Sequence, residues 1–212
     1  MNHAQKWSAI IFMLLISNSV LAETKVLMII NEGFWAPEYY KPRERFDKEG
    51  YRITVAAKRL GSIKPDERNT KFKAVDSQIS FSKIRVQDYD AIVFAGGNGA
   101  WTDYFPNEDV HKIVQDALAE NKILALLCSS TGLLGVAKNF DALTPIAANR
   151  KATGYYRVRA LIEKVGQIKY DPGIENKPYV VVDGNLITGR DPMSSELFAE
   201  TIVKKLNEMN KK

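Results

Sequence analysis

Short apolar runs that are typical of buried strands alternate along this chain with amphipathic segments that are typical of helices. Strands are predicted over residues 25–31, 52–57, 91–95 and 123–127, and helices over 37–49, 107–121, about 131–138 and 194–211. Residues 180–188 predict a hairpin with a primed turn. Because parallel strands need crossover connections, usually helices, this order predicts a doubly wound α/β sandwich with a mostly parallel sheet. In such a fold the ligand site lies at the carboxyl ends of the strands.

Cys128 is the single cysteine of the chain, and it stands where the predicted strand 123–127 meets the small residues 129–132 and a predicted helix. The unpaired N–H groups at a helix start carry partial positive charge, which stabilises a thiolate and lowers the thiol pKa. A reactive thiol with a lowered pKa is therefore predicted. The alternative is a small buried side chain at the end of a core strand, since free cysteine is often buried.

The start of the chain has the pattern of a secretory signal peptide: a weakly basic beginning, an apolar run over 9–16, and Ala22 at the cleavage position. The apolar run is much shorter than the roughly 20 residues that a membrane span needs. We therefore predict a signal peptide over residues 1–22 and one domain over 23–212. The processed protein is expected in the periplasm or outside the cell, and free of the membrane. A single cysteine cannot form an internal disulfide, so chemistry is the favoured reason for Cys128 in an exported protein.

The charge of the chain is moderately basic, with a formal net charge of +5 and an isoelectric point of about 9.1. This alone permits binding to nucleic acid or to an anionic surface. The densest basic stretch is 150–159, which also contains Tyr155 and Tyr156, so a binding strip is one interpretation. Charges of both signs are interspersed along the chain, which favours a solvated surface, and no nucleic-acid partner is predicted.

Glu38 follows the first predicted strand, in a segment that runs from Gly33 to Pro42. Proline inside a helix removes a hydrogen bond and clashes with the carbonyl four residues earlier, so Pro42 predicts a kinked first turn around Glu38. A carboxyl fixed there could face the thiol. The alternative is an ordinary acid in the first turn of a helix, where the dipole favours it.

A second glycine-rich turn, 96–99, comes directly after the predicted strand 91–95. It lacks the spacing of a dinucleotide site and the lysine of a phosphate loop, so no cofactor site is predicted, and no metal site either. Glycines let the backbone approach a ligand closely, so the N–H groups of Gly97 and Asn98 could join that of Ser129 in an oxyanion hole. The alternative is a turn with no such role.

Four segments together resemble the ThiJ/PfpI superfamily, which includes the Parkinson-disease protein and the PfpI-type intracellular proteases. They are Pro37-Glu38-Tyr39 with Pro42, Phe46 and Gly50; Val93-Phe94-Ala95-Gly96-Gly97; residues 123–131 around Cys128; and residues 180–192. A weaker likeness covers residues 150–155. The resemblance implies a flavodoxin-like three-layer sandwich, also described as class I glutamine amidotransferase-like, and a homodimer or higher homo-oligomer. It further implies that Cys128 is a nucleophile or redox-sensing cysteine at a nucleophile elbow, that Glu38 is its acidic partner, and that Gly97 and Ser129 supply amide donors.

The chain departs from the PfpI-type pattern in its histidines. Ser129 stands where PfpI-type proteases have a histidine directly after the cysteine, and no histidine lies between Asn139 and Lys151. Peptidase or amidase activity is therefore the least favoured function. Glu38 remains as the matched base, which suits a thiolate that attacks an aldehyde while a carboxyl moves protons, as in the glyoxalase or deglycase activity of relatives.

Two classes of function remain open from the sequence. In the first, the protein is an enzyme and its ligand is a small α-oxoaldehyde or an adduct of one. In the second, oxidation of Cys128 to a sulfenic or sulfinic acid makes the protein an oxidative-stress sensor or chaperone without enzymatic activity. One histidine remains beyond the predicted signal peptide, His111, and the apolar pattern of helix 107–121 places it toward solvent.

Overall fold

The computed structural model of this chain describes residues 23–141 and 143–211, so the predicted signal peptide lies outside the described residues. Its centre is a seven-stranded sheet in the order β10-β11-β7-β6-β1-β2-β5. Neighbouring strands are parallel except for β10 and β11. The strands of this sheet are β1 (Lys25–Ile29), β2 (Arg52–Ala57), β5 (Ile79–Ser80), β6 (Ala91–Phe94), β7 (Ile123–Leu127), β10 (Val180–Asp183) and β11 (Leu186–Gly189).

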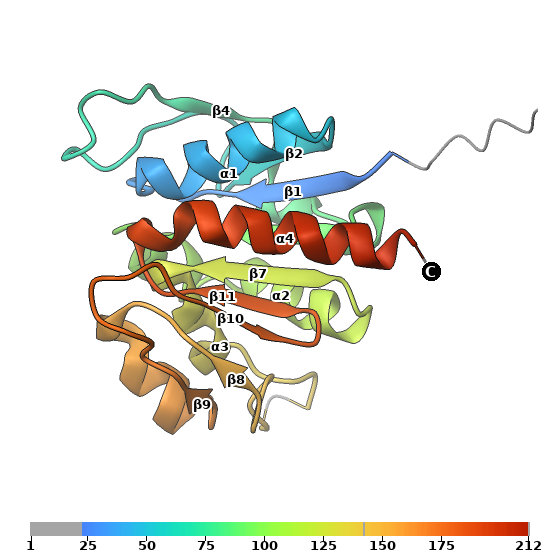
Figure 1. Cartoon of the computed structure of the whole chain (residues 1–212), viewed down its shortest axis with the longest axis vertical. Helices are drawn as coiled ribbons and strands as arrows, with labels where there is room; N and C mark the ends of the chain where they lie inside the picture. The colour runs from blue at the N-terminus through green and yellow to red at the C-terminus, as the bar shows by residue number, and fades with distance from the viewer. Residues whose placement is uncertain (1–22, 142, 212) are drawn as a thin grey trace, which may run out of the picture.

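Helices cover both faces of the sheet, which makes the three layers of a flavodoxin-like sandwich (Figure 1). On one face lie α1 (Ala36–Lys48) and α4 (Ser195–Met209), and on the other lie α2 (Glu108–Ala119) and the short α3 (Leu133–Val136). Two small two-stranded sheets flank this body, β3 (Gly61–Ile63) with β4 (Val75–Ser77), and β8 (Lys151–Ala152) with β9 (Lys169–Tyr170). The predicted α/β class is confirmed.

The long elements match their predicted positions because the apolar pattern of each is long and regular. Asn107 caps α2, as its side chain accepts hydrogen bonds from Asp109 N (3.0 Å) and Val110 N (3.3 Å). The hairpin is also confirmed: Gly184 has a φ of 59°, the positive value that a type II′ turn needs at its first central position. The expected kink in α1 is not a break, since the helix runs through Pro42.

The helix predicted over about residues 131–138 is present but much shorter than expected. A 3₁₀ turn over Cys128–Gly132 comes first, and α3 then has four residues and ends at Val136. The buried hydroxyls of this segment explain the tight turn, because Ser130 Oγ and Thr131 Oγ1 each donate to a carbonyl three residues earlier, at 2.7 Å and 2.6 Å.

The parallel strands place four loops at one edge of the sheet. The arrows of β1 and β7 point to this same edge in Figure 1. The loops that follow β1, β6, β7 and β11 therefore meet there, as expected at the carboxyl ends of strands. In the part of the chain that the structure describes, every helix is too short or too polar to cross a bilayer.

Candidate active site

Cys128 lies at the turn between β7 and the 3₁₀ segment, in the left-handed region with a φ of 59°. A non-glycine residue in this region carries roughly 1–2 kcal/mol of strain, and such strain is found at functional sites. Neighbouring groups hold the turn in place: Leu127 N donates to Ser130 Oγ at 2.9 Å, and Tyr155 N donates to the Cys128 carbonyl at 3.2 Å. The predicted nucleophile elbow is therefore present.

Small residues are required around this elbow. A Cβ atom at Gly132 would lie 2.6 Å from the ring of Phe105, and one at Gly96 would lie 2.7 Å from Ser129 Oγ and 2.8 Å from Glu38 Oε2. Gly96 therefore lets three parts of the chain meet within van der Waals distance. The sequence predicted that the glycines of turn 96–99 let the backbone approach a ligand, but it did not predict that Gly96 lies against Ser129 and Glu38.

Glu38 lies in the first turn of α1 and is 1% exposed. Its Oε2 accepts a hydrogen bond of 2.7 Å from Gly96 N. Among the described residues, its Oε1 has no hydrogen-bond partner of ordinary geometry. The Cys128 thiol nevertheless lies close enough to lower the carboxyl pKa by hydrogen bonding. The two predicted catalytic residues are therefore brought together.

Burial controls the proton affinity of this carboxyl. Desolvation raises the pKa of Glu38 to about 8, against the opposing effects of the Cys128 thiol and the Gly96 N–H, and the negative charge of Asp191 adds a smaller rise. At neutral pH the carboxyl is therefore mostly protonated. It gains the ability to accept a proton as the pH rises through about 8.

The predicted lowering of the thiol pKa is wrong. Burial raises the pKa of Cys128 well above its ordinary value, the Glu38 carboxyl raises it further, and the N–H of Ser129 lowers it. The helix that was expected to stabilise the thiolate has only four α-helical residues, so its dipole is small. The pair of Cys128 and Glu38 therefore holds both of its protons at neutral pH and releases the first near pH 8.

The glycine-rich turn approaches the elbow closely, but its amides already have partners. Gly97 N donates to Ser129 Oγ at 2.9 Å, and Asn98 N donates to the Gly33 carbonyl at 3.2 Å. The expected free donors at Gly97 and Asn98 are therefore engaged within the protein in this structure. The N–H of Ser129 differs, because it faces the sulfur of Cys128 and lowers its pKa.

A cavity of about 210 Å³ opens above the thiol. Predicted site residues line it, together with others that the sequence did not indicate. The lining residues are Trp35, Glu38, Arg68, Gly97, Asn98, Trp101, Cys128, Ser129, Tyr155 and Pro192. Aromatic side chains therefore make up much of its wall, and the lining described by the structure contains no histidine.

Arg68 is the cation at this cavity, and it is held in a fixed position. Its Nε and Nη2 donate to the two carboxylate oxygens of Asp66 at 2.7 Å and 2.9 Å, and its guanidinium lies 4.8 Å from the centre of the Trp35 ring. Asp66 also accepts from Asn98 Nδ2 at 2.8 Å. Arg68 belongs to a long connection without hydrophobic periodicity, so its position was not predictable from the sequence.

The basic stretch 150–159 is not a bare positive strip. Arg150 lies 3.5 Å from Asp183, Arg159 lies 3.0 Å from Glu163, and Arg157 donates to Tyr156 Oη at 3.0 Å. These contacts agree with the interpretation of a solvated surface. Within residues 23–141 and 143–211, no group of three His, Cys, Asp or Glu side chains is placed to hold a metal ion.

His111 is not the solvent-facing side chain that was predicted. It is half-buried, and its Nε2 lies 2.8 Å from the Phe105 carbonyl. The apolar face of α2 was predicted correctly, as Val110, Ile113, Val114 and Ala117 are all buried. The contact with the segment before the helix was missed, because helical periodicity carries no information about it.

We expect His111→Ala to change turnover by less than about threefold, because the residue does not line the cavity. Loss of the hydrogen bond to the Phe105 carbonyl should lower the free energy of unfolding by about 1 kcal/mol. Steady-state kinetics and thermal unfolding measure the two effects. A loss of two orders of magnitude in turnover, with the fold intact, would show that an imidazole takes part in the reaction.

The chain is similar to known proteins in sequence and in fold. A family model described as the DJ-1/PfpI family matches residues 24–205. A deglycase of Thermococcus kodakarensis is 27% identical over 171 residues, which cover 79% of this chain and 90% of that protein. Glyoxalase 3 of Candida albicans is 23% identical over 208 residues, which cover 81% and 88%. The crystal structure of a ThiJ/PfpI domain protein from Brachyspira murdochii has a TM-score of 0.75 at 24% identity, and the match covers 88% of this chain and 98% of that one.

Proposed function

The chain belongs to the DJ-1/PfpI family, and on that basis we propose that it is a cysteine-dependent enzyme of the glyoxalase or deglycase type. Its substrate is a small α-oxoaldehyde or an adduct of one. The observation that carries this proposal is the Glu38 carboxyl, which is buried beside Cys128 and has a pKa of about 8. Relatives named glyoxalase and deglycase support the same chemistry at low identity.

In the proposed reaction, Glu38 accepts the proton of the Cys128 thiol, and Sγ attacks the aldehyde carbon. The proton passes to the new alkoxide, which gives a thiohemiacetal. Glu38 then removes the proton from the former aldehyde carbon and delivers one to the neighbouring ketone carbon, while the hydroxyl proton passes to the ketone oxygen. The first carbon is oxidised and the second is reduced, so no outside oxidant is needed. Water hydrolyses the resulting thioester, which releases the 2-hydroxy acid and the thiol.

The backbone supplies one donor for the oxyanion in this scheme. We assign the role to the N–H of Ser129, because it already faces the sulfur. The amides of Gly97 and Asn98 could join it only after giving up their acceptors, Ser129 Oγ and the Gly33 carbonyl. A peptidase mechanism is less favoured, because it would need a base such as histidine at the thiol.

The test of this function is the conversion of methylglyoxal to lactate by residues 23–212 without glutathione. We expect saturable turnover that increases as the pH rises through about 8, since Glu38 must be ionised to accept the thiol proton. No lactate at any pH would contradict the proposal. Stoichiometric oxidation of Cys128 by peroxide in a protein without turnover would then favour the sensor function.

We also propose that the protein is exported and that residues 1–22 are removed. The support is the short apolar run over residues 9–16, with Ala22 at the cleavage position that follows it. Mass spectrometry of the processed protein should give a chain that begins at Glu23. A mature chain that retains Met1, or one recovered only from membranes, would contradict export by this signal.

A further inference from the structure

Two consecutive peptide groups lie between the candidate active site and the interior, directly after β6. The first joins Ala95 to Gly96, and its N–H donates to Glu38 Oε2 at 2.7 Å. The second joins Gly96 to Gly97, and its N–H donates to Ser129 Oγ at 2.9 Å. Both peptide bonds are trans, so each carbonyl points away from its own N–H and toward the interior.

The carbonyl of the first peptide group is held by the hydroxyl of Tyr104. Tyr104 Oη lies 3.1 Å from the Ala95 carbonyl oxygen and 3.1 Å from that of Ile29, so its proton is shared between the two. The side chain is fully buried, and its ring packs edge-on against that of Phe94, with 5.5 Å between the ring centres. Burial raises the pKa of Tyr104 well above its ordinary value, so the hydroxyl remains a donor at the pH where Glu38 titrates.

A second buried side chain, Asn31, contacts both carbonyls. Asn31 Nδ2 lies 3.2 Å from the Gly96 carbonyl oxygen and 3.5 Å from that of Ala95. The Gly96 carbonyl also accepts from Trp35 N at 3.2 Å. Gly99 leaves the space that Asn31 needs, because a Cβ atom there would overlap Asn31 Oδ1. Both peptide groups are therefore fixed from the side that faces the interior.

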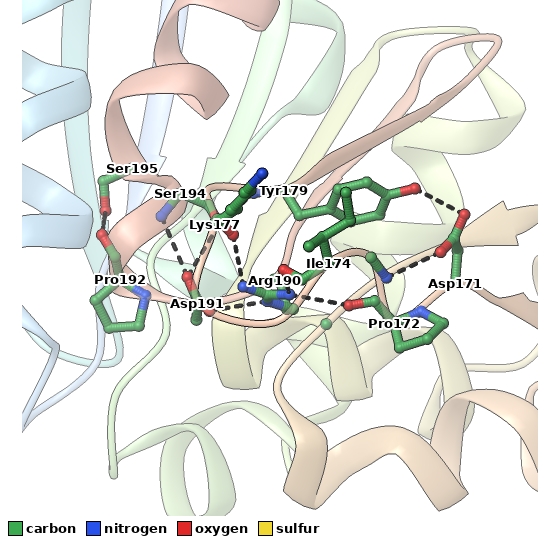
Figure 2. Close-up of polar contacts among 12 residues, drawn as sticks. Asp171, Pro172, Ile174, Lys177, Tyr179, Arg190, Asp191, Pro192, Ser194 and Ser195 are labelled. Atoms are coloured by element: carbon green, nitrogen blue, oxygen red, sulfur yellow. Dashed lines mark hydrogen bonds and ion pairs between the residues drawn. The ribbon is translucent and has the colours of Figure 1, made fainter.

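Other charged and titratable groups beside Glu38 are fixed as well. The titratable side chains that face its carboxyl are Cys128, Tyr104 and Asp191. The Asp191 carboxylate, which follows β11, accepts from Arg190 Nε at 2.9 Å and from Ser194 Oγ at 3.0 Å (Figure 2). The negative charge of Asp191 opposes the ionisation of Glu38, and these contacts hold that charge in place.

The Gly96 N–H favours the ionised form of the Glu38 carboxyl throughout the proposed reaction. The Cys128 thiol also favours it, but the thiol gives up its proton when sulfur attacks the substrate. A donor on the carbonyl of a peptide group polarises the whole group and strengthens the hydrogen bond that its N–H makes. The hydroxyl of Tyr104 therefore acts on Glu38 through the first peptide group.

From this geometry we infer that Tyr104 is a positioning residue for the acid–base pair, and that Asn31 assists it. Their side chains hold the two peptide groups so that the N–H of Gly96 stays directed at Glu38. The inference rests on the proposed function, which makes Glu38 the base. Neither Tyr104 nor Asn31 lines the cavity above the thiol, so each acts through the backbone and not on the substrate.

Tyr104→Phe tests the inference, because it removes the hydroxyl and keeps the ring that packs against Phe94. NMR of the Glu38 carboxyl carbon, whose signal is identified by its absence in Glu38→Gln, measures the titration midpoint. We expect the midpoint to rise by at least about 0.3 pH unit, because a less polarised Gly96 N–H stabilises the ionised carboxyl less. Asn31→Ala should move the midpoint in the same direction.

Tyr40→Phe is the matched control. The hydroxyl of Tyr40 also donates to one backbone carbonyl, that of Lys73, at 2.9 Å. It makes no contact with the peptide groups after β6, so its removal should leave the Glu38 midpoint unchanged. Turnover provides a second readout, because Glu38 must be ionised to accept the thiol proton. Methylglyoxal turnover at about pH 7 should be roughly twofold lower in Tyr104→Phe than in Tyr40→Phe, and the two rates should converge at high pH.

The outcomes separate positioning from packing and from the proposed function. A role in packing alone would lower the free energy of unfolding and leave the Glu38 midpoint where it is. An unchanged midpoint in folded Tyr104→Phe, or an equal shift in Tyr40→Phe, would therefore overturn the inference even if methylglyoxal is turned over. If Tyr104→Phe does not fold, the same criterion applies to Asn31→Ala. A raised midpoint in a protein that forms no lactate would support the positioning role and contradict the enzymatic function.

Discussion

Cys128→Ala is expected to lower the turnover of methylglyoxal by at least roughly 10³-fold, to near the uncatalysed rate. The reason is that the sulfur forms the bond to the substrate, and a methyl group cannot. The fold should survive, because alanine keeps the backbone contacts of the elbow, including those made by Ser130 and Tyr155. The assay is lactate formation at about pH 9, with circular dichroism as the check on folding.

A result that contradicts this account is lactate formation by Cys128→Ala at more than a tenth of the wild-type rate. The substrate would then react without a covalent bond to sulfur, and Glu38 would act as a base on the bound aldehyde hydrate or enediol. Cys128→Ser is a useful companion variant. Its oxygen has a higher pKa than sulfur, so it should also lose most of the activity while it keeps the size and polarity of the side chain.

Glu38→Gln is expected to lower turnover by at least about 10²-fold, within the range found for general acid–base groups. Glutamine has nearly the same shape, and its carbonyl oxygen can still accept from Gly96 N, as Oε2 does now. It cannot accept the thiol proton or move a proton between two carbons. Turnover within about threefold of the wild type would remove the carboxyl from the mechanism.

The same variant should change how stability depends on pH. Folding raises the pKa of Glu38 from 4.5 to about 8, so between these values the folded state holds a proton that the unfolded state has lost. The stability from the protonated carboxyl is complete below about pH 4.5 and is lost as the pH rises through about 8. Within this window, the Glu38 contribution to the free energy of unfolding falls by about 1.4 kcal/mol per pH unit.

Glutamine does not titrate, so this decline should be absent in Glu38→Gln. Denaturant unfolding of both proteins between about pH 5 and 9 measures the difference. Parallel stability curves would contradict a raised pKa at Glu38. The comparison also separates the two roles of the side chain, which are proton transfer and support of the fold. A variant that is inactive but more stable than the wild type at high pH has lost the group that carries protons and has kept the fold.

Features with a repeated local pattern were predictable from the sequence. The buried strand before Cys128, the capped helix α2 and the hairpin turn at Gly184 each follow from periodicity or from a residue with a special backbone preference. The meeting of Cys128 and Glu38 was also predictable, because parallel strands bring the loops after β1 and β7 to one edge.

Features that depend on tertiary contacts were not predictable. The thiol pKa is raised because both Cys128 and Glu38 are buried, which a sequence does not report. The amide of Gly97 has a partner because the Ser129 hydroxyl happens to lie 2.9 Å away. Arg68 comes from the long connection between β3 and β4, where no apolar repeat marks a position.

The central claim is that Cys128 and Glu38 titrate as one pair. The rate of Cys128 alkylation by iodoacetamide between about pH 5 and 10, in the wild type and in Glu38→Gln, tests it most directly. The wild-type rate is expected to rise only above about pH 8, because burial and the ionised Glu38 carboxyl both raise the thiol pKa. The Glu38→Gln rate should rise at a lower pH than the wild-type rate, because this variant lacks the carboxyl that adds to the rise of the thiol pKa. The same profile in both proteins, or a wild-type rate that is already at its maximum near pH 6, would contradict the account.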